Sequence, residues 1–379
     1  MDLTVPALMA LLGSCGGAVL GAAARGAQMC TLGAIEDASL GGNFTRAKAW
    51  ALTLALAVAG SQALDLSGVI NLHQSVYLNA RLGLVGLVLG GLLFGLGMAL
   101  VGTCSFGMLV RAAGGDLRAL VGLIVVAATG YMTLAGVTGV LRVALIEPLA
   151  VDMSSFHGQG VHDVLGGGAA GQLAVTITVI GGLLIFAFSR RALLRRPALI
   201  AGATAIGVTI PFGWLATGYF GADPFDPQRV ESFSYVRPLS DALMYLMTFS
   251  GATVSFGVGA VAGALGGAGM VAAWKHQFRW EAFDDQREMR RHLLGAALMG
   301  IGGVLALGCT IGQGLSAMST LSLGAPVALI SIIVGAVVGL QILVGTPVPE
   351  VLRQPRRLIH AATYAVLPKR ITRNGRLED

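Results

Sequence analysis

The sequence predicts an all-α polytopic membrane protein with about nine transmembrane helices. Only 12% of its 379 residues are charged, whereas soluble domains carry roughly 25%. The hydrophobic fraction is 55% and the mean hydropathy is +0.77. The apolar residues come in long runs, and a membrane span needs about 20 of them. A soluble enzyme would need much more polar surface, and a disordered chain would need low hydrophobicity.

Nine apolar segments follow one another along the chain. The first begins almost at Met1 without a basic stretch before it, so we interpret it as part of the mature fold and not as a signal peptide. The seventh is longer than one crossing needs, and it is either one tilted span or a span with a half-helix. The predicted spans are 3–24, 47–65, 82–102, 119–139, 171–188, 198–217, 241–273, 293–308 and 325–345.

The basic residues predict that the N-terminus lies outside and the C-terminus in the cytoplasm, because cytoplasmic loops of membrane proteins are enriched in Lys and Arg. In this orientation all but four of the 25 Lys and Arg residues lie inside, the exceptions being Arg81, Arg142, Arg229 and Arg237. The net charge of +6 then reflects the cytoplasmic face of a protein in a lipid bilayer, and it requires no nucleic acid partner.

A repeat relates two halves of the chain. Residues 94–107 and 299–312 match at a constant offset of 205, and the match includes a cysteine as well as glycines that are common in membrane helices. In the predicted orientation the two copies enter from opposite faces, as in the inverted repeats of transporters, which place their site near the midplane. We therefore predict one transport domain, 1–379, with a first half, 1–189, a second half, 198–345, and a basic cytoplasmic tail, 346–379. The matched pairs are Gly95 and Gly300, Gly97 and Gly302, Leu100 and Leu305, Cys104 and Cys309, and Gly107 and Gly312.

The four cysteines are Cys15, Cys30, Cys104 and Cys309, and none forms a C-x-x-C redox motif. Cys15 lies between small residues of the first span, where we expect it only to pack. Each of the other three lies in a glycine-rich turn, either as a small residue at a tightly packed position or as a thiol that meets a substrate. A disulfide between Cys104 and Cys309 would lock the repeats together, which suits neither a gate nor a relay.

The glycines around these three cysteines favour short re-entrant helices. Non-helical backbone at membrane depth must be buried in protein or line a cavity, and a helix that begins there offers free N–H groups to an anion. The second-half counterpart of the Cys30 segment would be 254–259, which has no cysteine and forms a weak match. His157 and His162 lack a third ligand, so we expect neither a metal nor a cofactor.

Taken together, the three cysteine motifs resemble those of the YeeE/YedE family of sulfur transporters. They are Arg25-x4-Cys30-x2-Gly33, Gly95-x-Gly97-x4-Gly102-x-Cys104-x2-Gly107-x3-Arg111 and Gly300-x-Gly302-x6-Cys309-x2-Gly312. The resemblance implies an hourglass-shaped protein of the bacterial inner membrane, built as an inverted repeat with short re-entrant helices. Thr103 departs from the pattern, because many members have glycine there, and its hydroxyl bears on substrate choice. The resemblance further implies a substrate path along Cys30, Cys104 and Cys309, with Gly33, Gly102, Gly107, Gly308, Gly312, Arg25 and Arg111 around it.

Thiosulfate, a dianion with three oxygens and one soft terminal sulfur, suits these groups. Helix N-termini would hold its oxygens, and neutral thiols would offer weak S–H donors to its sulfur. A thiolate would repel the dianion, so we expect protonated thiols. Arg25 and Arg111 either attract the anion on the inner side or anchor the protein at the cytoplasmic face.

We therefore predict a membrane transporter, and not an enzyme, that takes up thiosulfate or a closely related sulfur anion. The resemblance also allows another sulfur or selenium species as substrate and a cytoplasmic sulfur-carrier protein as partner. The alternative is a membrane thiol oxidoreductase, which would need paired cysteines or a quinone or haem site. A structural protein or receptor would leave the cysteine repeat unexplained. The sequence has no G-x-x-x-x-G-K-[ST] motif, which disfavours direct ATP-driven transport.

Overall fold

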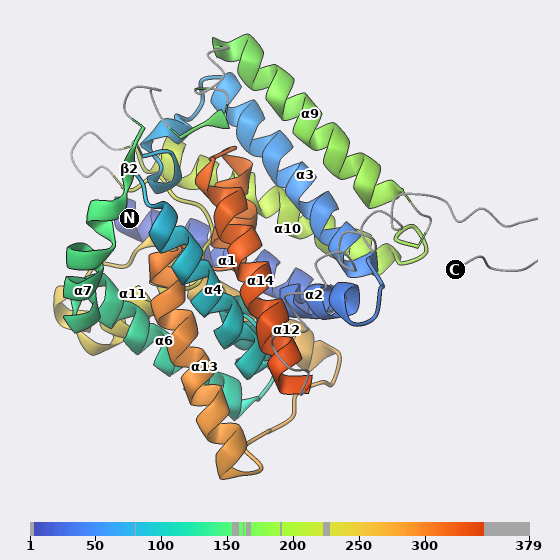
Figure 1. Cartoon of the computed structure of the whole chain (residues 1–379), viewed down its shortest axis with the longest axis vertical. Coiled ribbons are helices and arrows are strands. Elements are labelled where there is room, and N and C mark those ends of the chain that lie inside the picture. The colour runs from blue at the N-terminus through green and yellow to red at the C-terminus, as the bar shows by residue number, and fades with distance from the viewer. Residues whose placement is uncertain are drawn as a thin grey trace, which may run out of the picture.

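A computed structural model describes residues 4–79, 81–153, 159–161, 163, 168–189, 192–222 and 228–344. About three quarters of these residues are helical (Figure 1). The predicted tail 346–379, His157 and His162 lie outside the described residues. The long helices are α1 (Val5–Ala27), α3 (Thr45–Leu66), α4 (Leu84–Val101), α6 (Leu117–Ala135), α9 (Gly168–Phe188), α10 (Pro197–Leu215), α12 (Phe256–Trp274), α13 (Gln286–Leu305) and α14 (Gly324–Val344).

Eight helical segments of the described chain are long and apolar enough to cross a membrane, against the nine spans expected. The remaining long helix is α13, whose first turns carry Arg287, Glu288, Arg290 and Arg291. Its apolar part begins only at Leu293, which is where the sequence placed the start of the span. The all-α polytopic class is confirmed, and α13 differs from the other long helices because a charged extension precedes its apolar part.

Short elements lie between the long helices. The predicted segment 241–273 is not one tilted span, because α11 (Arg237–Met247) and η6 (Phe249–Gly251) precede α12. The only paired strands in the described chain are β1 (Arg81–Leu82) and β2 (Val151–Asp152), which are antiparallel with Arg81 opposite Asp152. The other short helices are α2 (Thr31–Ser39), η1 (Leu72–Gln74), η2 (Val76–Leu78), α5 (Ser105–Ala112), α7 (Val137–Leu145), η3 (Glu147–Leu149) and the π-helical η5 (Ala216–Phe220) and η7 (Gly312–Ala317).

The helices pack in matched pairs. Helix α1 packs on α12 as α10 packs on α3, and α4 packs on α14 as α13 packs on α6. The pattern is explained when the two repeat copies are aligned element by element. The first copy then runs α1, α2, α3, α4, α5, α6, and the corresponding elements of the second copy are α10, α11, α12, α13, η7, α14. Helices α1 and α10 also contact each other, as do α4 and α13. In this register α11 is the counterpart of the short helix after Cys30, and the weak sequence match at 254–259 lies elsewhere, at the start of α12.

Close backbone contacts at glycines join α1 to α12. A Cβ atom on Gly17 would lie 2.3 Å from the carbonyl oxygen of Ala260, and one on Gly263 would lie 2.1 Å from that of Ser14. The Ser14 hydroxyl donates to the Gly259 carbonyl across the same interface at 3.1 Å. Lipid tails are as apolar as leucine, so helices in a bilayer associate through such close packing and not through the hydrophobic effect. The contact glycines recur every four residues, as Gly13, Gly17 and Gly21 on α1 and Gly259, Gly263 and Gly267 on α12.

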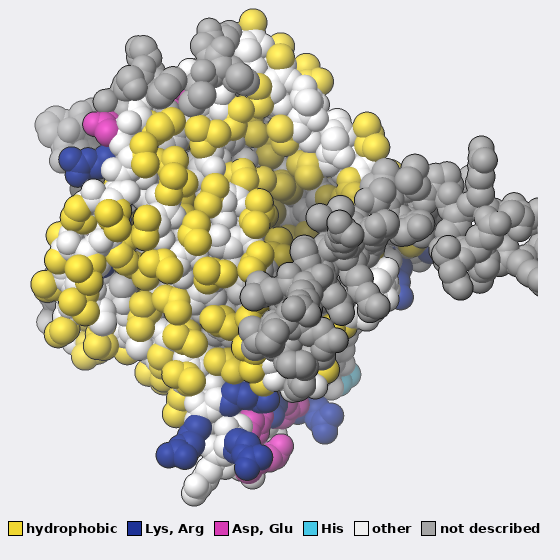
Figure 2. All heavy atoms as spheres, viewed as in Figure 1, with side chains coloured by type: hydrophobic (Ala, Val, Ile, Leu, Met, Phe, Trp, Pro, Cys, Tyr) yellow, Lys and Arg dark blue, Asp and Glu magenta, His cyan; other side chains and the backbone are white. Residues whose placement is uncertain are grey.

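The outer surface has the pattern expected of a membrane protein. Figure 2 shows a broad hydrophobic face, with most charged side chains gathered at the lower end of the molecule and a few at its upper left edge. Large apolar side chains on the long helices are exposed, among them Ile177, Met270 and Ile330. In water such a surface would be a site of aggregation, whereas in a bilayer it faces lipid.

We expect Gly17→Leu to lower the stability of the protein by at least roughly 1–3 kcal/mol, because the added side chain would collide with the α12 backbone. Thermal unfolding in detergent would measure the effect. The matched control is Gly182→Leu on α9, where a Cβ would meet nothing within 4 Å. Equal unfolding temperatures for the two variants would contradict this account of the α1–α12 contact.

Candidate functional site

Cys30, Cys104 and Cys309 occupy equivalent places, each at the start of a short helix. Cys30 is the N-cap of α2 and Cys104 is the N-cap of α5. Their sulfur atoms accept the backbone N–H of Gly33 at 3.5 Å and of Gly107 at 3.4 Å. Cys309 accepts the N–H of Gly312 at 3.4 Å in the same way, ahead of η7. The thiols therefore replace the Ser, Thr, Asp or Asn side chains that usually cap helices, although sulfur is a weaker acceptor.

The glycine three residues after each cysteine leaves space for a neighbouring side chain. A Cβ on Gly107 would lie 2.0 Å from Thr103 Oγ1, and one on Gly312 would lie 2.6 Å from Ser234 Oγ. A Cβ on Gly33 would lie 2.7 Å from Arg46 Nη1. The Cys-x-x-Gly spacing thus allows polar side chains to approach the beginning of each short helix.

The same backbone turn precedes all three cysteines. Two residues before each cysteine the chain enters the left-handed region, at Gln28 (φ 53°), Gly102 (φ 84°) and Leu307 (φ 58°). Left-handed residues of this kind end helices. At the offset of 205 the counterpart of Gly102 is Leu307, and Gly308 is the counterpart of Thr103. The turn could not be recognised from the sequence, because only one of the three left-handed residues is a glycine.

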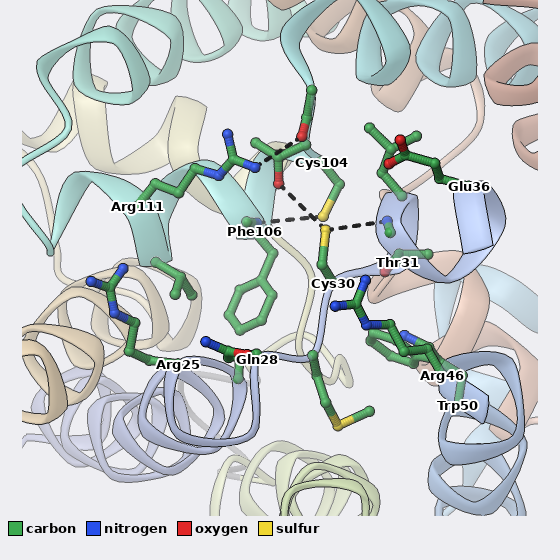
Figure 3. Close-up of a pocket in the computed structure, with 18 of the residues that line it drawn as sticks. Arg25, Gln28, Cys30, Thr31, Glu36, Arg46, Trp50, Cys104, Phe106 and Arg111 are labelled. Atoms are coloured by element: carbon green, nitrogen blue, oxygen red, sulfur yellow. Dashed lines mark hydrogen bonds between the residues drawn. The ribbon is translucent and has the colours of Figure 1, made fainter. Parts of the chain in front are cut away.

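Cys30 and Cys104 open onto one cavity of about 570 Å³, which also includes Gly33, Gly102 and Gly107. Figure 3 shows their sulfur atoms facing each other, and the Thr103 hydroxyl lies 4.0 Å from Cys30 Sγ. Cys30 is partly exposed and Cys104 is buried. Cys309 is also buried and does not line this cavity. The Cys104 thiol lies near both other thiols and beside the Thr310 side chain. Cys104 is therefore the member of the group that has both Cys30 and Cys309 as neighbours.

Three arginines line the same cavity, two predicted and one not. Arg111 donates to the Gly102 carbonyl at 3.1 Å, and Arg25 donates to the Gln277 carbonyl at 3.1 Å. Sequence reasoning missed Arg46, which pairs with Asp37 at 3.3 Å and reaches Gly33. Figure 3 shows all three guanidinium groups around the cavity. Glu36 is its acidic lining residue, so positive charge predominates.

A second cavity of about 240 Å³ lies next to the third cysteine motif. It is formed where α13 ends and α11 begins, which are the counterparts of α4 and α2 at the first cavity. Gly308 lines it, and Tyr77 and Ser234 extend from it toward Gly312. Its charged lining residues are Arg142, Arg237 and Glu231. The sequence analysis did not select these residues, because they come from loops and helix ends distant from the cysteine motifs.

Several buried polar atoms around the Cys309 turn have no hydrogen-bond partner in the described part of the chain. They are Thr310 Oγ1, Gln313 Oε1 and the Tyr235 hydroxyl. Buried polar groups are nearly always paired, so such atoms mark places where a polar ligand or water belongs. These three groups thus surround the cysteine that is sealed from both cavities.

Comparison with known proteins gives consistent matches. The sequence pattern of the family described as Sulphur transport matches residues 25–338. The chain is 24% identical over 330 residues to the thiosulfate transporter TsuA of Escherichia coli (strain K12), covering 81% of this chain and 87% of that protein. It is 26% identical over 284 residues to the thiosulfate transporter TsuA of Spirochaeta thermophila, covering 67% of this chain and 76% of that protein.

We expect Gly107→Ala to destabilise the Cys104 turn, because the new methyl group would overlap the Thr103 hydroxyl. The loss should be roughly 1–3 kcal/mol in thermal unfolding. Thr103→Ala in the same chain removes the overlapping atom, so the double variant should recover most of the stability. A double variant as unstable as Gly107→Ala alone would show that another contact limits this position.

Proposed function

This chain belongs to the sulphur transport family, and we propose that it carries thiosulfate or a closely related sulfur anion across the bacterial inner membrane along three thiols. The observation that carries the proposal is the position of Cys104. It opens onto the first cavity with Cys30, and it neighbours Cys309 of the other repeat copy, whose turn borders the second cavity. In this proposal the three thiols form a series between two cavities that share no lining residue. The names of the TsuA relatives support thiosulfate as the substrate.

The groups around each cavity suit the two ends of thiosulfate. Guanidinium groups and backbone N–H groups at helix starts attract its oxygens. Arg25, Arg46 and Arg111 supply the charge in the first cavity, and Arg142 and Arg237 supply it in the second. The thiols meet the terminal sulfur, to which a neutral S–H group donates a weak hydrogen bond. Weak contacts at several places favour conduction, because the ion must leave each site as well as enter it.

The predicted orientation of the protein in the membrane gives the order in which the anion would meet the three thiols. With the N-terminus outside, the second cavity faces out and the first faces the cytoplasm, consistent with the clustering of Arg25, Arg46 and Arg111 at the first. The anion would pass Cys309, then Cys104, then Cys30. The unpaired groups of Thr310 and Tyr235 would assist at the sealed step beside Cys309. A cytoplasmic sulfur-carrier protein would receive the anion at the first cavity.

The thiol relay predicts a specific pattern of loss among cysteine variants. In a host without its own sulfate and thiosulfate uptake, growth on thiosulfate should be restored by the wild type and by Cys15→Ala, since Cys15 belongs to neither cavity. Cys30→Ala, Cys104→Ala and Cys309→Ala should fail, with Cys104→Ala the most severe. Membrane expression of every variant must be measured alongside growth.

Two other outcomes would change the proposal in different ways. Growth by all four cysteine variants would retain the transporter and rule out the thiol mechanism. Failure of a well-expressed wild type would indicate another substrate, such as a selenium species, or a thiol oxidoreductase. Direct assay with sulfite, selenium compounds and persulfides would then separate these two alternatives.

We expect Arg111→Gln to reduce uptake at low thiosulfate by about ten-fold or more, because hydrogen bonds to charged groups contribute about 1.5–3 kcal/mol and about 1.4 kcal/mol corresponds to a factor of ten. The reduction should shrink as thiosulfate approaches saturation. Arg287→Gln is the matched control, since Arg287 is exposed at the start of α13 and lines neither cavity. Equal uptake by the two variants in vesicles would show that Arg111 does not bind the anion and serves only to anchor the Gly102 turn through its hydrogen bond.

A further inference from the structure

An apolar cleft of about 500 Å³ opens on the side of the molecule. Helices α3 and α9 form one wall, α14 forms the other, and α2 and η7 complete its floor. Figure 1 shows α3 and α9 side by side, with α14 across from them and α2 at the lower end. Apart from Thr31, Ser39 and Thr310, every side chain that lines the cleft is apolar or absent, including those of Ile35, Leu54, Phe186, Ile333 and Val337.

The cleft lies between helix faces that are already exposed to lipid. On α9 the side chain of Ile185 is 70% exposed beside the lining residue Phe186, and on α14 that of Ile330 is 60% exposed beside the lining residue Leu329. Figure 2 shows the broad apolar surface to which α14 belongs. Because both walls continue into the lipid-facing surface, the medium at the mouth of the cleft is hydrocarbon and not water.

Neither vacuum nor water is a stable filling for such a cleft. An empty space deprives the side chains around it of dispersion contacts. Ordered water needs two to four polar partners, and polar atoms are few here. Those present are the hydroxyls of Thr31, Ser39 and Thr310 and the indole N–H of Trp50. The Ser39 hydroxyl already donates to the Glu36 carbonyl, and the Trp50 N–H is buried without a hydrogen-bond partner in the described chain. Acyl chains of the surrounding bilayer can make dispersion contacts with the apolar walls, and they lose no hydrogen bonds to water when they enter the cleft.

We propose that an acyl chain of a membrane phospholipid occupies this cleft and packs against α2. The main helix neighbours of α2 are α3 and α14, and the side chains of Ala34, Ile35 and Ala38 face the space between them. The acyl chain covers this remaining face of the helix that Cys30 caps. Trp50 and Thr31 line both the cleft and the cavity of Cys30, so a single layer of side chains separates the lipid from that cavity.

Trp50 makes the proposal directly measurable, because bromine on a lipid chain quenches a tryptophan that it contacts. The four tryptophans are Trp50, Trp214, Trp274 and Trp280. Trp274 and Trp280 are exposed and are replaced by Phe in the test protein. Trp214 is fully buried and remains as an unquenched internal reference. The full chain is then reconstituted in phosphatidylcholine with or without bromine on its acyl chains, and fluorescence is compared.

We expect brominated lipid to remove most of the Trp50 emission, and the loss should disappear in Trp50→Phe. Ala51→Phe, which fills the cleft, should reduce the loss by more than half, and Ala47→Phe on the same wall serves if the first variant does not fold. Ala174→Phe is the matched control on the exposed face of α9 and should leave quenching unchanged. These readouts do not depend on the anion transported or on transport at all.

Three results would overturn the proposal. The first is no quenching of Trp50 in brominated lipid. The second is equal quenching with and without the filling substitution, which would place the lipid contact outside the cleft. The third is quenching that appears only in a chain ending at residue 345, which would assign the cleft to the C-terminal segment of the protein itself.

Discussion

The structure depends on how the chain breaks between its apolar helices without leaving backbone N–H and C=O groups unpaired. Hydrocarbon offers no hydrogen bonds, so each break must satisfy its own N–H and C=O groups. Here one solution occurs three times: a left-handed residue ends the first helix, and two residues later a cysteine caps the next. The cap that stabilises the break is also the thiol proposed to meet the substrate, so the structural and transport roles lie on one atom.

Close helix packing holds together the long helices that flank these breaks. Glycines on α1 and α12 let the two backbones touch, and α4 likewise packs closely on α13, where a Cβ added to Gly90 would lie 2.7 Å from the carbonyl oxygen of Gly302. The two helices are antiparallel, with Gly86 facing Leu305 and Gly97 facing Gly295, so the Cys104 turn and the Cys309 turn begin at opposite ends of this pair. The glycines therefore determine how closely the helices that carry these turns approach one another, although none of these interface glycines lines a cavity.

Polar and apolar spaces are separated by single side chains around α2. On one side of this helix lies a cavity with three arginines, and on the other lies a cleft of almost entirely hydrocarbon character. Trp50 borders both, with its ring available to the cleft and its N–H group unpaired. A short helix in such a position has few protein neighbours, and the proposed acyl chain would cover the face of α2 that the protein leaves open.

The sequence by itself determined the all-α membrane class, the positions of the apolar helices and the three cysteine turns, because hydropathy and local glycine spacing act over a few residues. Only the tertiary structure decided that Leu307 and Gln28 adopt the backbone of Gly102, that α11 is the counterpart of α2, and which side chains join each cavity. Arg46, Tyr77 and Ser234 could not be found from the motifs, since their nearness to Gly33 and Gly312 arises from packing between distant segments. Apolar periodicity shows that a helix is buried or faces lipid, but it does not identify its neighbour.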